Sequence, residues 1–163
     1  MVASVKRPQE NRQITNIKNM NSSRTNTNEL EDLKVNTKIK LAALWTSVTF
    51  FYIYGDYFEL YVPNKVQGII NGNSMLDNPV KLFVASLLLA VPALMVCLSV
   101  ILKPKINRWL NLIAGIFFTA IMLLIAVTSI SEWKAFYVFY AIVESILTSI
   151  IVWYAWKWTK IKN

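Results

Sequence analysis

The sequence contains no histidine and a single cysteine, Cys97. One chain of this composition forms no internal disulfide, no CxxC redox pair, no histidine-ligated metal or haem site and no nucleophile–histidine pair. Charged residues are also scarce, at 16% of the chain, and only nine residues are acidic. Most familiar enzyme chemistries are thereby excluded, and no cofactor or metal is expected.

Apolar residues dominate what is present. Of the 163 residues, 55% are hydrophobic and 13% aromatic, which is more than a soluble domain of this length carries. The net charge of +8 would also suit a nucleic-acid-binding protein. In a chain this apolar, Lys and Arg retained on one side of a bilayer explain the charge better. The expected partner is therefore the lipid bilayer and not nucleic acid.

The first 37 residues differ from the rest of the chain. Residues 1–27 are rich in Asn, Ser and Thr with scattered basic residues, and such segments bury too little apolar surface to fold. The string "NELEDLKVN" from Asn28 offers an N-cap for a short surface helix. No apolar run of signal-peptide length occurs here, so the first span is expected to direct insertion. We predict a disordered, basic cytoplasmic tail over residues 1–37.

Four apolar stretches follow the tail. They cover about 41–62, 82–102, 109–130 and 135–156. Each supplies the roughly 20 residues that a helix needs to cross about 30 Å of hydrocarbon. Pro63 and short polar segments separate them. The sequence predicts an all-α, integral membrane protein in which residues 38–163 form a four-helix transmembrane bundle.

Basic residues predict the orientation of this bundle. Fourteen Lys and Arg residues lie before Leu41, in the loop between the second and third stretches or at the C-terminus. Only Lys65, Lys81 and Lys134 lie on the other side. The positive-inside bias therefore places both termini in the cytoplasm, in a multi-pass protein of the bacterial inner membrane. Tryptophans such as Trp45 are expected in the belt at the membrane boundary.

Small and polar side chains predict which helix faces point inward. Helices in lipid associate through such residues, and each stretch carries one stripe of them at helical spacing. The stripes are Thr49, Tyr52, Asp56 and Glu59; Ser86, Ala90, Ala93 and Cys97, with Pro92 beside them; Asn111, Gly115, Thr119, Met122, Ala126 and Ser129; and Tyr137, Ala141, Glu144 and Thr148, with Tyr140 adjacent.

Three carboxylates lie within these stretches. At about 1.5 Å per residue, Glu59 lies some 5 Å inside the outer boundary, Asp56 about 9 Å and Glu144 about 14 Å. Carboxylates at such depth are costly and usually face the protein interior. No Lys or Arg lies level with Glu144, so its carboxyl must be protonated, hydrogen-bonded, or beside water or a ligand. Glu59 is close enough to the surface to be merely interfacial.

We expect these carboxylates to share one acidic site. Glu144 would donate a hydrogen bond to Asp56, and Tyr52 or Tyr140 would complete the network. With Glu59, these residues form a candidate site for a small molecule, a lipid or a proton.

Three strings resemble a known group of proteins: "LWTSVTFFYIYGDYFELYVP", "NRWLNLIAGI" and "YVFYAIVESILTSIIVWYAWKW". They are similar to a bacterial and archaeal family of small four-span membrane proteins known only as a domain of unknown function. A likeness to DoxX-like proteins extends to the layout alone. The resemblance covers about 41–158 and implies no reaction. It implies that the following residues occupy family positions: Tyr52, Asp56, Asn111, Glu144, Trp153 and Trp156.

Three functions remain open from the sequence. The favoured one is binding of a small molecule, lipid or proton at the acidic and tyrosine-rich site. The first alternative is a structural or accessory membrane subunit, and a homo-oligomer is also compatible with the sequence. The second is an acid–base enzyme acting on a lipid-like substrate, because two carboxylates can shuttle protons. Binding is favoured over catalysis.

Overall fold

The computed structural model describes residues 34–158. The chain divides into two units, Met1–Lys34 and Val35–Asn163, and every helix described below lies in the second. The predicted disordered tail, with its short surface helix, falls almost wholly on residues outside the described range. That part of the sequence analysis stays a prediction.

The described residues form helices and connecting turns. Four long helices are α2 (Thr37–Glu59), α4 (Pro79–Ile101), α5 (Pro104–Thr128) and α6 (Ala135–Trp156). A short helix, α3 (Lys65–Ile70), follows α2, and one 3-10 turn, η1 (Glu132–Lys134), precedes α6. No strand occurs between residues 34 and 158, so the predicted all-α class is confirmed for this part.

Three of the helical segments are long and apolar enough to cross a membrane. They are Pro79–Ile101, Pro104–Thr128 and Glu132–Trp156, and much of their apolar surface is exposed on the protein. Soluble monomers rarely expose apolar patches of this extent, so these helices indicate a membrane protein. α2 is as long as α4, with 23 residues, but its Tyr, Thr and Ser residues make it less apolar.

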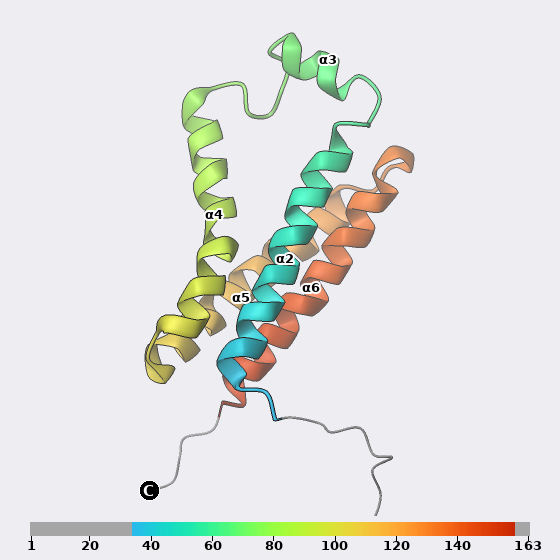
Figure 1. Cartoon of the computed structure of the whole chain (residues 1–163). Helices are drawn as coiled ribbons and strands as arrows, with labels where there is room; N and C mark the ends of the chain where they lie inside the picture. Colours follow the sequence, from blue (N-terminus) through green and yellow to red (C-terminus); the bar gives the residue numbers. More distant parts are fainter. Residues whose placement is uncertain (1–33, 159–163) are drawn as a thin grey trace, which may run out of the picture. The chain divides into compact units, whose positions relative to one another are not determined.

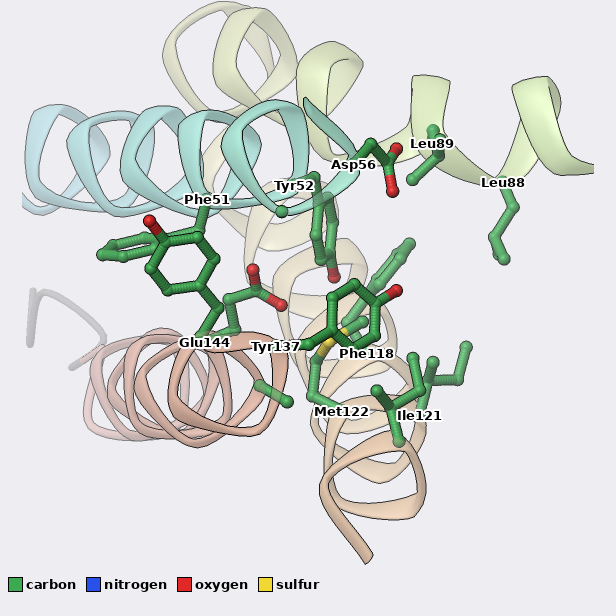
Figure 2. A pocket seen from close by; sticks show the side chains of 14 residues that line it. Phe51, Tyr52, Asp56, Leu88, Leu89, Phe118, Ile121, Met122, Tyr137 and Glu144 are labelled. Atoms are coloured by element: carbon green, nitrogen blue, oxygen red, sulfur yellow. The ribbon is translucent and has the colours of Figure 1, made fainter. Parts of the chain in front are cut away.

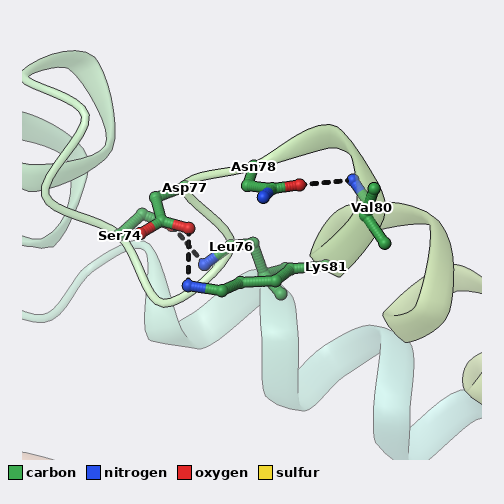
Figure 3. Close-up of polar contacts among 6 residues, drawn as sticks. All are labelled: Ser74, Leu76, Asp77, Asn78, Val80 and Lys81. Atoms are coloured by element: carbon green, nitrogen blue, oxygen red, sulfur yellow. Dashed lines mark hydrogen bonds and ion pairs between the residues drawn. The ribbon is translucent and has the colours of Figure 1, made fainter.

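Local sequence explains where α2 and α4 begin. Asn36 caps α2 by accepting a hydrogen bond from the backbone N–H of Lys38 at 3.0 Å. Asn78 caps α4 in the same way, with 2.7 Å to the N–H of Val80 (Figure 3). Pro79 then occupies the first turn of α4, where its missing N–H costs nothing. Figure 3 also shows the ion pair between Lys81 and Asp77, at 2.7 Å.

The long helices pack in a defined order. α2 packs between α4 and α6, and α6 packs along α5 (Figure 1). α4 bends near its middle (Figure 1), where Pro92 removes one helical hydrogen bond. Residues 79–91 of α4 are exposed or half-buried, whereas Pro92, Met95 and Ser99 are buried. α4 therefore packs through its C-terminal half.

An aromatic and polar core joins these helices. The ring of Trp45 on α2 meets that of Phe118 on α5 edge to face, with 6.0 Å between ring centroids. Trp45 is fully buried, so its predicted place in the membrane-boundary belt is wrong. The indole N–H needs a partner inside the protein and finds one on Asn111.

Two predicted inward faces are confirmed. On α5, Asn111, Gly115 and Met122 are buried, and on α6 the buried residues include Ala141 and Glu144. Thr119 on α5 and Thr148 on α6 hydrogen-bond to each other across the helix pair at 2.7 Å. Small and polar side chains at helical spacing therefore mark the interface between these two helices correctly.

The predicted face of α4 is wrong. Ser86, Ala93 and Cys97 are exposed, and α4 instead buries the face that carries Pro92 and Met95. α4 is apolar on every side, so its sequence pattern does not distinguish the face that packs from the face toward lipid. On α2 the buried face is also rotated from the expected stripe, so that Asp56 lies at its exposed edge.

Candidate functional site

A cavity of about 110 Å³ lies where all four long helices contribute side chains. Its residues come from 51–56 of α2, 88–89 of α4, 118–125 of α5 and 137–144 of α6. Four of the five predicted site residues line it: Tyr52, Asp56, Tyr140 and Glu144. Figure 2 shows side chains from the different helices converging on this space.

Glu144 is the most deeply buried acidic residue of the described part, with 3% of its surface exposed. It follows Ala141 and precedes Thr148 on the inward face of α6, so the helix itself turns its side chain inward. Its backbone carbonyl accepts a hydrogen bond from the Thr148 hydroxyl at 2.8 Å. Its carboxyl group forms no ion pair with any residue of the described part.

Tyr52 faces the cavity from α2. Its side chain is 9% exposed, and its hydroxyl is the one buried side-chain polar atom without a hydrogen-bond partner among the described residues. The ring packs against Phe118, with 6.1 Å between centroids. Buried phenol groups usually have a partner, so an unpartnered one at a cavity wall is a position where a ligand or water can bind.

Asp56 and Tyr140 complete the polar wall. Asp56 lies one helical turn after Tyr52 and is exposed at the edge of the cavity (Figure 2). Tyr140 is half-buried on α6, and its ring meets that of Phe51 edge to face at 5.3 Å. The described side chains do not form the expected hydrogen bond from Glu144 to Asp56. The two carboxyl groups line the same cavity without being bonded to each other.

Glu59 lies outside this cavity. It is the last residue of α2, and its carboxylate pairs with the ammonium group of Lys65 on α3 at 2.5 Å. α2 ends at Glu59 and not near Val62 as predicted, which brings Glu59 to the end of the helix. The geometry therefore favours the interfacial alternative for this residue.

The sequence analysis did not assign Tyr137 and Phe118 to the site, although both line the cavity. Tyr137 precedes Glu144 by seven residues on α6, and the predicted inward stripe already placed both on one side of the helix. Phe118 has no such signal, because a phenylalanine in an apolar helix is as easily exposed to lipid. Its position against Trp45 and Tyr52 depends on how α2 and α5 pack.

Backbone space at Gly55 shapes one side of the cavity. A Cβ atom on Gly55 would lie 3.6 Å from Cδ2 of Tyr140 and 3.7 Å from Cε2 of Tyr137. These are ordinary van der Waals distances, so a methyl group at this position would contact both rings without displacing them.

The chemistry of the lining is acidic, phenolic and apolar. Neither Lys nor Arg lines the cavity. Within residues 34–158, no group of three or more His, Cys, Asp or Glu side chains is placed to hold a metal ion. The arrangement can accept hydrogen bonds through carboxyl and phenol oxygens and can surround an apolar group with aromatic rings.

Comparison with known proteins supports the resemblance noted in the sequence. Residues 29–163 match a family described as "Family of unknown function (DUF6326)". The chain belongs to this family. No curated protein and no solved structure gives a significant match. The match includes all four long helices and therefore every residue that lines the cavity.

Proposed function

We propose that this protein is a four-span membrane protein that binds a small molecule in the cavity between its helices. The observation that carries the proposal is the pair of polar groups at the cavity wall: the buried Tyr52 hydroxyl, which has no partner, and the buried Glu144 carboxyl, which has no ion-pair partner. Buried polar groups cost free energy when they are left unpaired. A bound ligand would provide the missing partners.

The fourth span in this proposal is α2. Its 23 residues give a length of about 35 Å, enough to cross the hydrocarbon core, and it packs between two of the apolar helices. Basic side chains gather at one end of the four helices: Lys38 and Lys40 at the start of α2, Arg108 at the start of α5 and Lys157 after α6. This distribution supports cytoplasmic termini in the bacterial inner membrane. The cavity then lies in the outer half of the protein.

A purely structural role for the buried carboxyl group has less support. Polar side chains that hold these helices together are bonded to one another, as Thr119 is to Thr148 and Trp45 to Asn111. Glu144 differs from them because its carboxyl faces a cavity. Catalysis on a lipid-like substrate is also less well supported, because the cavity is smaller than the roughly 300–1,000 Å³ of drug-sized ligand sites.

The proposal is tested by filling the cavity. Ala141 is 2% exposed and lines the cavity, so Ala141→Leu should occupy it, whereas Ala120→Leu makes the same change on an exposed position of α5. Both variants and the wild type would be placed in lipid nanodiscs and screened by saturation-transfer NMR. The screen would use a panel of cationic, anionic and neutral compounds no larger than benzene, which fits a protein cavity of about 150 Å³.

We expect at least one compound to bind the wild type and Ala120→Leu but not Ala141→Leu. Circular dichroism would show whether all three proteins are folded. If Ala141→Leu is misfolded, Gly55→Ala reduces the same cavity with a smaller change. A panel in which no compound distinguishes the cavity variants from the wild type would overturn the proposal.

A further inference from the structure

The charge of the cavity indicates what class of ligand it takes. This inference rests on the proposed function, because it concerns the occupant of the same cavity. Asp56 on α2 and Glu144 on α6 are the two carboxyl groups that line it, and no basic side chain lines it. Two carboxyl groups in a low-dielectric cavity that no basic side chain lines attract a positive charge. The cavity is thus electrostatically suited to a cation.

The aromatic residues narrow the class of cation. Five aromatic rings line the cavity: Phe51, Tyr52, Phe118, Tyr137 and Tyr140. Aromatic faces attract ammonium groups through their quadrupoles, and an aromatic cage is a recurring way to bind alkylated ammonium ions. Most of the remaining lining is Leu, Ile, Met and Ala, which offers no ligands to an inorganic ion. The walls therefore suit an organic cation better than a metal ion.

Hydrogen-bonding capacity agrees with this class. An ammonium group has only donors, while an ionised carboxylate has only acceptors and the phenol oxygen of Tyr52 can accept as well. In Figure 2 the Tyr52 and Glu144 side chains extend from different helices toward the same space. An ammonium ion between them would give the unpartnered phenol oxygen a donor and the carboxyl group an opposite charge.

Size and access limit the alkyl part. The volume of about 110 Å³ is smaller than a protein cavity that accommodates benzene. Leu88 and Leu89 on α4 provide an apolar wall for a short alkyl chain, and Asp56 at the exposed edge places a negative charge where a cation would enter. We propose that the cavity binds a small alkylammonium ion, with its nitrogen near Glu144 and Tyr52 and its alkyl group against the aromatic and leucine side chains.

The test compares three probes of nearly the same shape: butylammonium, 1-butanol and butyrate. Their binding would be measured by calorimetry at pH 7 on the full chain in nanodiscs of zwitterionic phosphatidylcholine, which avoids attraction of the cation to anionic lipid. We expect butylammonium to bind about tenfold or more tightly than 1-butanol, because the neutral alcohol lacks the charge, and butyrate not to bind.

Variants connect this preference to the cavity. Glu144→Gln keeps the shape of the side chain but cannot ionise beside a bound cation, and should weaken butylammonium binding about tenfold. Glu132→Gln, the same change on an exposed residue of η1, is the matched control and should leave binding unchanged. Equal binding of butylammonium and 1-butanol, or an unchanged affinity in a folded Glu144→Gln protein, would overturn the inference.

The result distinguishes this inference from the proposed function. Binding of 1-butanol or another neutral compound that is lost in Ala141→Leu would leave a ligand-binding cavity with a different preference. Binding of no compound at all would overturn both. Preferential binding of butylammonium that persists in Ala141→Leu would place the cation outside the cavity and would also overturn the inference.

Discussion

The indole N–H of Trp45 on α2 donates a hydrogen bond to Oδ1 of Asn111 on α5, over 2.7 Å. Both side chains are completely buried. The Ser99 hydroxyl on α4 donates to the same oxygen at 3.4 Å, and the Asn111 amide nitrogen donates to Oδ1 of Asn107 at 2.6 Å. Every polar group of Asn111 is bonded, so this network joins three helices and leaves no site for a ligand.

We predict that Asn111→Ala lowers the free energy of unfolding by about 1–3 kcal/mol, because it leaves the Trp45 N–H buried without a partner. Unfolding by SDS titration, followed by circular dichroism, would measure the change. Trp109→Phe serves as the control, since Trp109 is 61% exposed. If both variants unfold like the wild type, the network contributes nothing to stability.

Gly115 should not tolerate a methyl group. A Cβ atom there would lie 2.7 Å from Cγ2 of Val152 on α6, and a β-branched residue in a helix has little freedom to rotate away. We expect Gly115→Ala to lower the unfolding free energy by about 1–3 kcal/mol through overpacking. Gly55→Ala, where the nearest side-chain atom would be 3.6 Å away, should fold normally. Comparable stability of the two variants would mean that α5 and α6 do not pack this closely.

Removing the hydroxyl of Tyr52 should stabilise the protein when no ligand is bound. In the protein without ligand, Tyr52→Phe removes a buried polar atom that has no partner, and we expect about 1 kcal/mol of stabilisation. Tyr57→Phe is the control, because Tyr57 is exposed and bonds only to the hydroxyl of Tyr61. Thermal unfolding in detergent would compare the two. A clear loss of stability in Tyr52→Phe alone would show that this hydroxyl has a partner in the folded protein.

Both termini should be cytoplasmic. Reporter fusions after residues Ile70, Ile106 and Asn163 would measure this, with the first expected outside and the other two inside. The reason is the positive-inside bias, since moving either terminus across the membrane would carry several Lys and Arg residues with it. Any other pattern of reporter activity would contradict the four-span arrangement. In that case α2 would be the first helix to reconsider as a membrane span, because it is less apolar than α4.

Much of the helical fold could be predicted from the sequence. The apolar stretches predicted the long helices, and the bounds of α6 are the predicted ones, 135–156. The inward faces of α5 and α6 were also predicted, because one stripe on each helix collects small and polar residues at helical spacing. The burial of Glu144 was predicted from its place on the inward stripe of α6, and it directed attention to the residues that line the cavity.

Other features could not be predicted because they depend on a second helix. Cys97 was expected to pack inward, but α4 is apolar all round and buries a different face. Trp45 was expected at the membrane boundary, but a buried amide on α5 accepts its N–H. Glu59 was expected among the site residues, but α2 ends there and Lys65 lies within reach.

The sequence by itself determined the helical class, the apolar lengths and the presence of one acidic residue, Glu144, in an apolar stretch that contains no Lys or Arg. Only the tertiary structure decided which polar groups have partners and where a cavity remains. The physical reason is that helical periodicity relates residues along one helix, whereas the rotation of that helix depends on the shapes it packs against. Asn111 and Glu144 are both polar and buried, yet packing fully bonds the first and leaves the second facing an open space.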